Sequence, residues 1–486
     1  MRDLRNMPHP DRLPANRNYL SFLFLLAVLL SFLVLMISLN RYFDHDEFEH
    51  IHSAWYVTNN QIPYLDFFEQ HHPLLWYLLA PFLSFLGNST PTVTVLRILM
   101  FIFLLGMAFF TCRIAEQITR SRETGLISAI LLLSSTMFVK VGIEVRPDVP
   151  EVFFGLISIL SLFRYFQSAR DRDIIISGLA ASIAFLFLQK ITILLFCYAA
   201  VFIYKIVRKH FSLKPVLLFS AGFSLPVILF LGGLIISGSL KEYLLNNWVL
   251  FFQDISRISP WPFLWEFFPQ NLLPWVILPV AIIFIISNRQ SGGEIKTITF
   301  IFLTLFLSVL ITPHPFPQYY LLALPLGSIA SAFFLTDILN RIKSGIILRT
   351  VIVIIFIAGP VFYLCKETQK TNRSQLDMIN YVFQNSEESD FIYDGDIRFN
   401  LFRRDLHYFW FSVGTDKGLF RYRAMKKNKY IGGFIEKNYL SYNICKLIRI
   451  KKPRFISDYA LSLDKCQLRK SYAQTEFSRL YIRMEK

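Results

Sequence analysis

The hydrophobic residues of this chain are gathered into long runs separated by short polar stretches. From residue 19 to residue 364 the runs recur at about the length needed to cross a hydrocarbon core. Lipid offers no hydrogen-bond partners to a bare backbone, so each run must form a helix. The pattern predicts eleven spans, at residues 19–39, 92–112, 124–141, 152–166, 174–188, 191–207, 215–237, 272–287, 297–312, 319–336 and 346–364.

Residues 73–86 form an apolar run of only fourteen residues, which is short for a crossing. We expect this run to lie at, or dip into, the outer membrane surface. With it left out of the count, the loops rich in arginine and lysine all fall on one side, as cytoplasmic loops do. Residues 40–88 and the polar tail 365–486 then lie outside. Counting the run as a span gives twelve spans and a cytoplasmic tail, and this alternative stays open.

The composition agrees with a membrane protein. Hydrophobic residues make up 54% of the chain and charged residues only 17%, whereas soluble domains carry about 25%. Much of the net charge of +16 lies in short loops beside the spans, where it sets their orientation, so we expect membrane lipids and no nucleic acid as partners. Of the five cysteines, only Cys445 and Cys466 are candidates for a disulfide, and only in an oxidising compartment.

The outer segment 40–88 is strongly acidic. It holds six carboxylates against the single Arg41: Asp44, Asp46, Glu47, Glu49, Asp66 and Glu69. Carboxylates that cluster near low-dielectric membrane can have raised pKa values, which suits a general base, and Asp46 is the candidate. The alternative is structural, with Asp46 as the N-cap of a helix and Glu49 completing a variant of the capping box.

Two adjacent histidines, His71 and His72, stand directly before Pro73. They could bind a divalent metal together with Glu69. Adjacent histidines point apart on a helix, however, and proline favours an extended residue before it. A helix that begins at Pro73, with His72 near its positive end, is the structural alternative.

Further polar groups recur on the predicted outer face. Ionisable residues beside spans are candidates for function because their desolvation is costly. Lys190 either reaches the membrane surface with its long side chain or contacts a phosphate there. The candidate substrate-binding residues are Arg146, Asp148, Lys190, Arg257, His314, Tyr319 and Tyr320.

These residues form an ordered set that resembles a known family. The set comprises Asp46-Glu47, then residues 64–74 (YLDFFEQHHPL), Gly87 and Arg97, then Arg146-Pro147-Asp148, Lys190 and residues 314–320. It is similar to the polyprenyl-phosphate-sugar-dependent glycosyltransferases of the GT-C type, in particular the family 39-like protein O-mannosyltransferases and aminoarabinose transferases. One departure is His72, which stands where the family has the first proline of its acid-x-His-Pro-Pro-Leu pattern.

The resemblance implies an α-helical polytopic membrane protein of the GT-C type with a small C-terminal α/β domain. It implies that Asp46 is the catalytic base, with Glu47 beside it, and that Glu69 belongs to the acid-x-His pattern. The tail resembles the small outer domain of some of these enzymes.

Residues and resemblance together predict a glycosyltransferase in the cytoplasmic membrane, with its active site on the outer face. It would move a sugar from a polyprenyl-phosphate donor to a lipid, glycan or protein acceptor, with inversion at the anomeric carbon. A cation would stabilise the departing phosphate, in the order Lys190, Arg146, Arg257. The alternatives are a transporter of lipid-linked sugars and a polysaccharide polymerase or ligase that uses a lipid diphosphate.

Overall fold

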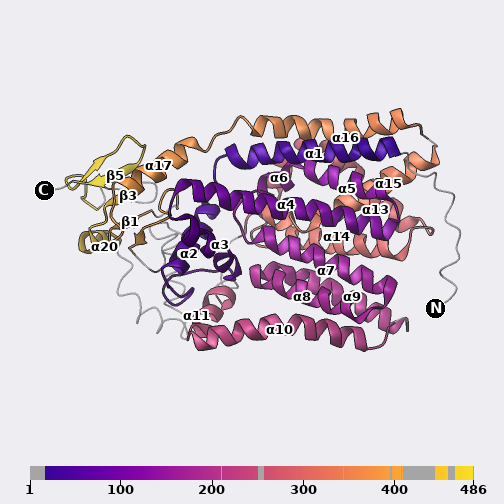
Figure 1. The fold of residues 1–486 in the computed structure, drawn as a ribbon, viewed down its shortest axis with the longest axis horizontal. Coiled ribbons are helices and arrows are strands. Elements are labelled where there is room, and N and C mark those ends of the chain that lie inside the picture. Colours follow the sequence, from indigo (N-terminus) through magenta and orange to yellow (C-terminus); the bar gives the residue numbers. More distant parts are fainter. Residues whose placement is uncertain are drawn as a thin grey trace.

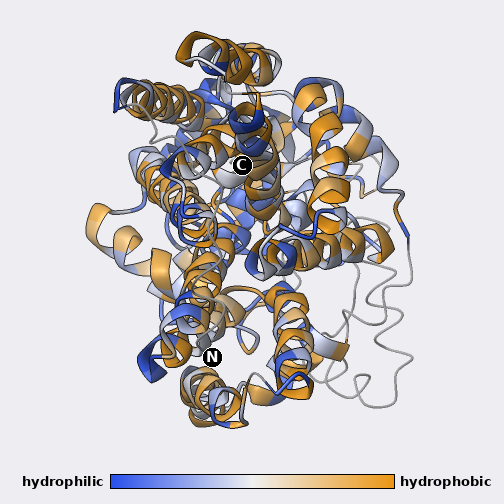
Figure 2. Ribbon diagram, turned by 90° about the vertical axis from the view of Figure 1, so that its right-hand side faces the viewer, coloured by the Kyte–Doolittle hydropathy of each residue, from blue (hydrophilic) through white to orange (hydrophobic). Residues whose placement is uncertain are grey.

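The computed structural model describes residues 17–209, 211–249, 257–342, 344–394, 397–406, 408, 444–457, 463 and 466–484. Its long helices run side by side, and a small sheet domain lies at one end of the bundle, beside α17 (Arg373–Gln384; Figure 1). The helices of the bundle are largely hydrophobic (Figure 2). Large apolar side chains such as Ile228 and Ile236 are mostly exposed, as expected of a surface that faces lipid.

Nine helices of the described chain are long and apolar enough to cross a membrane. They are α1 (Arg17–Asn40), α4 (Thr90–Thr119), α7 (Asp148–Ser168), α9 (Thr192–Val207) with the preceding turn η2 (Gln189–Ile191), α10 (Lys214–Ile236), α13 (Leu272–Ser287) with the preceding turn η5 (Pro269–Asn271), α14 (Gly293–Ile311), α15 (Ala323–Arg341) and α16 (Ile346–Glu367). A tenth span results if the bent pair α5 (Arg122–Ser134) and α6 (Thr136–Gly142) counts as one. The eleventh predicted span, 174–188, is α8 (Asp171–Phe187), whose 17 residues are at the short end for a crossing.

Small residues bring α8 and α10 close together. A side chain at Gly178 would meet the backbone carbonyl of Phe219, and one at Gly222 would meet that of Ile175. Such close approach is how helices associate in lipid, where apolar burial gives no driving force.

The bend of 69° between α5 and α6 shapes the path to the later site residues. Ser135 is extended at the break, and the chain resumes as α6. Asn271 fixes the new start, because it accepts from the backbone N–H of Thr136 at 3.0 Å and donates to its hydroxyl at 2.7 Å. Helix α6 then leads directly into the loop before α7.

Two short helices lie between α1 and α4. Helix α3 (Leu74–Leu86) has 13 residues, too few to span, as predicted. Helix α2 (His45–Thr58) begins with a capping box in which Asp44 accepts from the backbone N–H of Asp46 and Glu47 accepts from that of Asp44. The alternative in which Asp46 is the N-cap is therefore wrong, and the side chain of Asp46 is released for another role.

Further short elements connect the spans: α11 (Leu240–Leu244), η3 (Leu245–Val249), α12 (Trp261–Phe267) and η6 (Pro317–Tyr320). The tail contains α17 (Arg373–Gln384), α20 (Ile444–Lys451) and a sheet of order β2-β1-β3-β5-β4. Its strands are β1 (Phe391–Tyr393), β2 (Arg404–Asp405), β3 (Phe455–Ser457), β4 (Tyr472–Gln474) and β5 (Leu480–Arg483), with β1 parallel to both neighbours and the others antiparallel. A small α/β tail was predicted, and Cys445 and Cys466 are bonded in it.

The tail is docked on α2 and the end of α1. Gln375 bonds both backbone groups of Phe43, at 2.7 and 2.9 Å. The fully buried ring of His52 lies between Asp405, at 2.6 Å, and the carbonyl of Leu401, at 3.0 Å. Because buried polar groups need partners, these contacts fix the tail against the acidic segment.

Candidate active site

Five of the predicted site residues lie in one continuous network. Arg146 donates to Asp46, and its Nε lies 3.7 Å from Asp148. Lys190 Nζ lies 2.6 Å from the other oxygen of Asp148 and 3.7 Å from the centre of the Tyr319 ring. These contacts link Asp46 of α2 to Asp148 of α7, Lys190 of η2 and Tyr319 of η6.

The members of this network stand at or beside the ends of helices. Asp148 opens α7 behind Pro147, where the positive end of the helix favours a carboxylate. Lys190 lies in η2 between α8 and α9, and Tyr319 lies in η6 before α15. Polar groups at helix ends meet at one boundary of the bundle.

Asp46 is held as a carboxylate. Burial opposes its ionisation, but Arg146 and His45 outweigh burial and keep the pKa of Asp46 well below its usual range. The expectation of a raised pKa is therefore wrong for Asp46. His45 bonds its other oxygen at 3.0 Å, and this bond raises the pKa of His45 to about 9.

Arg146 and Lys190 differ in how far their charges are compensated. Arg146 is buried and faces Asp44 and Glu144, at 3.6 and 3.2 Å, besides Asp46 and Asp148. Lys190 pairs only with Asp148 within the described chain, and its side chain is 25% exposed. Of the two cations, Lys190 is therefore the one whose charge is less compensated and more accessible to a ligand.

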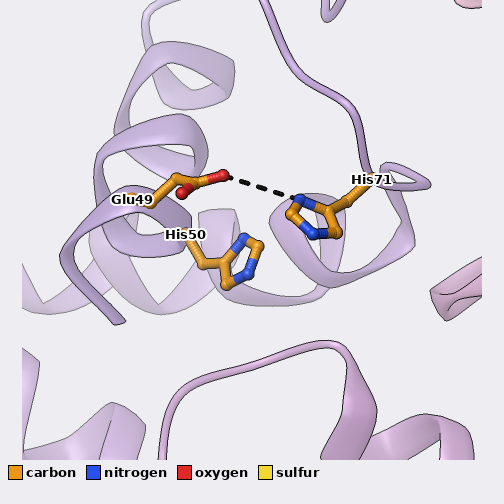
Figure 3. Close-up of side chains that lie close together, drawn as sticks. All are labelled: Glu49, His50 and His71. Carbon is orange, nitrogen blue, oxygen red and sulfur yellow. Dashed lines mark ion pairs between the residues drawn. The ribbon is translucent and has the colours of Figure 1, made fainter. Parts of the chain in front are cut away.

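A second cluster adjoins the first, and Figure 3 shows three of its members. The Nδ1 atom of His71 lies 3.5 Å from both Glu49 and Glu69, and the rings of His71 and His50 are in edge contact. Burial and the charge of Glu49 raise the pKa of Glu69 to about 8. Burial lowers the pKa of His50, and Asp46 opposes this shift, so the two clusters share one electrostatic field.

This second cluster fits a divalent cation. Donor atoms of Glu49, His50 and His71 all lie within 4.8 Å of one another, and the buried Oε1 of Glu49 has only the 3.5 Å approach of His71 Nδ1 in the described part of the chain. A dication would also relieve the repulsion between Glu49 and Glu69. Glu49 and His71 are the stronger ligands, because His50 Nδ1 already accepts from Trp76 at 3.3 Å.

The structure does not bring His72 into this donor set. Its Nδ1 donates to the carbonyl of Phe185 at 2.5 Å, and its Nε2 accepts from Tyr243 at 3.0 Å. Burial lowers its pKa to about 4, so His72 is a neutral, fully bonded side chain. Glu49 and His50 take its place, and sequence spacing gave no signal of that, because His71 approaches them only through the tertiary fold.

Both carboxylate oxygens of Glu47 accept hydrogen bonds that stabilise the fold. Its oxygens accept from Arg97 at 2.5 and 2.9 Å, from the backbone of Val145 at 3.1 Å and from the backbone of Asp44 at 2.9 Å. Arg97 is also fully buried. Glu47 therefore ties the start of α2 to the loop that carries Arg146, which positions Asp46 and Arg146 against each other.

Three predicted substrate-binding residues stay outside the network. Arg257 is exposed and makes no ion pair with described residues. His314 is half-buried and stacks on Phe316. Tyr320 is fully buried in an apolar cluster beside Phe306, and its hydroxyl has no partner among the described residues.

A cavity of about 430 Å³ opens between the start of α2 and the tail, with Asp44 and His45 in its wall. Its lining combines aromatic rings with charged and amide groups: Tyr42, Phe43, Asp44, His45, Phe48, Gln375, Ile397 and Arg398. His45 connects the cavity to the network, because it bonds both Asp44 and Asp46.

Residues 70–234 match the protein family described as dolichyl-phosphate-mannose-protein mannosyltransferase. The fold is similar to that of ArnT from Cupriavidus metallidurans bound to undecaprenyl phosphate, with a TM-score of 0.60 and 12% identity over 80% of this chain and 85% of that one. It is also similar to the Archaeoglobus fulgidus oligosaccharyltransferase in the apo form, with a TM-score of 0.56 and 12% identity over 86% and 68%. Archaeoglobus fulgidus AglB, in complex with an inhibitory peptide and a dolichol-phosphate, gives a TM-score of 0.54 and 11% identity over 90% and 69%. No curated protein sequence matches.

The fold defines the class: the chain is a helical polytopic membrane protein with a GT-C-like fold. Within that class, its sequence likeness over residues 70–234 is to the dolichyl-phosphate-mannose-protein mannosyltransferases. The predicted fold class is thereby confirmed.

Proposed function

We propose that the protein transfers a sugar from a polyprenyl-phosphate donor to an acceptor hydroxyl or amine on the outer face of the membrane, with Asp46 as the base. The observation that carries this proposal is the network in which an ionised Asp46 and the cation Lys190 are joined through Arg146 and Asp148. It supplies, at one boundary, an acceptor for a proton and a charge for a phosphate. The family match and the undecaprenyl phosphate in the similar ArnT structure support a lipid-phosphate donor.

The reaction is a single displacement. The acceptor oxygen or nitrogen bonds to the anomeric carbon while the bond from that carbon to the phosphate oxygen breaks, so the configuration inverts. The proton of the acceptor goes to Asp46, and the electron pair leaves with the lipid phosphate. A carboxylate of low pKa is a weak base, so we expect the proton to move late, when bond formation has made the acceptor strongly acidic.

Lys190 stabilises the departing phosphate. It has one carboxylate partner and a partly exposed ammonium group. Tyr319 limits its movement, because the ammonium lies over the ring face. A divalent cation on Glu49 and His71 would supply further positive charge near the same phosphate.

The cavity between the start of α2 and the tail is the proposed acceptor site. Its aromatic rings and its carboxylate, amide and guanidinium groups suit a polar acceptor such as a sugar ring, which offers hydroxyls to the polar groups and C–H faces to the rings. Gln375 and Arg398 belong to the tail, so the tail takes part in choosing the acceptor.

The disulfide supports an extracytoplasmic tail. Disulfides persist in oxidising compartments and are rare in the cytosol. Cys445 and Cys466 lie in the domain that packs on α2, so the same compartment would hold the network.

A donor panel tests the proposal. The purified protein in lipid is incubated with labelled polyprenyl-phosphate and polyprenyl-diphosphate sugars, and release of free lipid phosphate or diphosphate is measured together with sugar transfer. Asp46→Asn is expected to lower transfer by about 10²–10⁴-fold. Asp66→Asn is the matched control, since Asp66 is an exposed acid of the same segment, and it should keep full activity. Full activity of Asp46→Asn would remove Asp46 as the base, and turnover of diphosphates alone would overturn the donor.

A further inference from the structure

Four arginines line one hollow where α4 ends and α5 begins. This end of α4 points away from the tail (Figure 1). The hollow has a volume of about 430 Å³. It is lined by Arg113, Glu116, Gln117, Arg120, Arg122, Arg164 and Gln167. These residues come from the ends of α4 and α7 and the start of α5, so the fold gathers arginines that lie up to 51 positions apart.

The positive charge of the hollow is only partly compensated. Glu116 is held by Arg113 at 2.5 Å and Arg122 at 3.5 Å. The side chains of Arg120 and Arg164 make no hydrogen bond or ion pair with the residues that the structure describes.

A further carboxylate that the structure describes beside the hollow is on α14. Glu294 accepts from Gln167 at 3.0 Å and acts electrostatically on Arg120. In addition, Nε2 of Gln117 is buried without an acceptor in the described chain. Glu116 and Glu294 therefore compensate the four guanidinium groups only in part, and Glu294 also faces Lys205, so the hollow keeps positive charge for an anion.

We propose that this hollow binds the phosphate headgroup of an anionic phospholipid. Guanidinium forks match phosphate oxygens, and the volume is within the roughly 300–1,000 Å³ of small-ligand sites. Setting the orientation of spans requires arginines in the loops but not their convergence on one cavity. Basic pockets between membrane helices are suited to such headgroups.

An apolar track on α4 favours a lipid over a free phosphate. Phe109 stands four residues before Arg113, and Ile102 seven residues before Phe109, so the three side chains share one helix face. Phe109 and Ile102 are 57% and 58% exposed. An acyl chain can therefore lie along α4 while its headgroup occupies the hollow.

Lipid binding to the purified full chain tests the proposal. Phosphatidylglycerol, phosphatidylcholine and inorganic phosphate are titrated separately, with bound lipid counted by native mass spectrometry and the melting temperature followed in parallel. The variant Arg120→Gln/Arg164→Gln removes the two cations without described partners. The control Arg170→Gln/Arg172→Gln removes two exposed arginines at the start of α8 that do not line the hollow.

We expect the wild type to prefer phosphatidylglycerol, the Arg120/Arg164 variant to bind it roughly thirty-fold more weakly, and the control to match the wild type. If both variants lost affinity for phosphatidylglycerol equally, the loss would come from net charge alone, and the proposed site would be wrong. Equal affinity for phosphatidylcholine, or displacement of phosphatidylglycerol by millimolar phosphate, would overturn the lipid assignment. The wild-type titrations decide this even if the variant does not fold.

Discussion

Lys190 offers the sharpest test of the proposed chemistry. Its ammonium group lies 2.6 Å from Asp148 and over the Tyr319 ring, with a quarter of the side chain exposed. In Lys190→Gln the phosphate loses the cation nearest to it in the proposed complex. A positioned group that meets developing charge contributes about 10²–10³-fold to kcat, or roughly 3–4 kcal/mol. We expect kcat to fall by that factor.

A structural role for Lys190 would also lower activity, by a different route. The side chain of Asp148 is 4% exposed, and without Lys190 its nearest remaining cation is Arg146 Nε at 3.7 Å. Breaking a buried ion pair costs about 3–5 kcal/mol of stability. The double variant Asp148→Asn/Lys190→Gln removes both charges and separates the two roles.

The assay measures initial rates of lipid phosphate release over a range of donor concentrations, together with the melting temperature of each variant. If Lys190 acts on the phosphate, the double variant regains its melting temperature while kcat stays low. Lys214→Gln is the control, because it breaks another lysine–aspartate pair of 2.6 Å, with Asp171, at exposed positions. Recovery of kcat in the double variant to within about threefold of the wild type would refute the reasoning.

Three further predictions concern the surroundings of the site. Glu47→Gln is expected to cost about 3 kcal/mol or more of stability, seen as a lower melting temperature, because it leaves the buried Arg97 without its carboxylate. Glu49→Gln is expected to weaken Mn²⁺ binding by at least about tenfold in calorimetric titration, while an unchanged affinity would remove the cluster with His71 as a metal site. Burial raises the pKa of Asp394 from 3.8 to about 6 against three backbone N–H bonds, so its protonated form is favoured in the folded tail. The protonated form therefore contributes about 3 kcal/mol to the stability of the folded state. This stabilisation is complete below pH 3.8 and is lost as the pH rises through 6. The melting temperature of the wild type should fall over this window, and that of Asp394→Asn should not.

Much of the fold could be predicted because lipid leaves the backbone few choices. Runs of the right length must be helices, and the 13 residues of α3 are too few to cross. The bend at Ser135 could not be predicted, since it depends on Asn271, which is 135 positions from Thr136 in the sequence. The same holds for the helix start at Asp44, where two overlapping pairs, Asp44 with Glu47 and Asp46 with Glu49, both satisfy the capping pattern.

The candidate site, like the fold, could be predicted from the sequence only in part. Asp46, Arg146 and Lys190 could be singled out because charged residues beside spans require a reason. Their mutual distances could not, and so the pKa of Asp46 was predicted in the wrong direction: the deciding neighbour is Arg146, 100 positions away. Glu49 was visible only as one of six carboxylates and as a capping partner of Asp46, and its approach to His71 is a product of packing.

The seam between α2 and the tail has a consequence for diversification. The residues proposed to contact the donor, Lys190, Arg146 and Asp148, lie in the membrane half, whereas the proposed acceptor cavity has walls from both halves. On the proposed function, exchanging the C-terminal domain between relatives would change the acceptor and leave the proposed donor contacts intact. Such a graft would have to preserve the partners of Phe43 and His52, namely Gln375 and Asp405, because these hold the two halves in register.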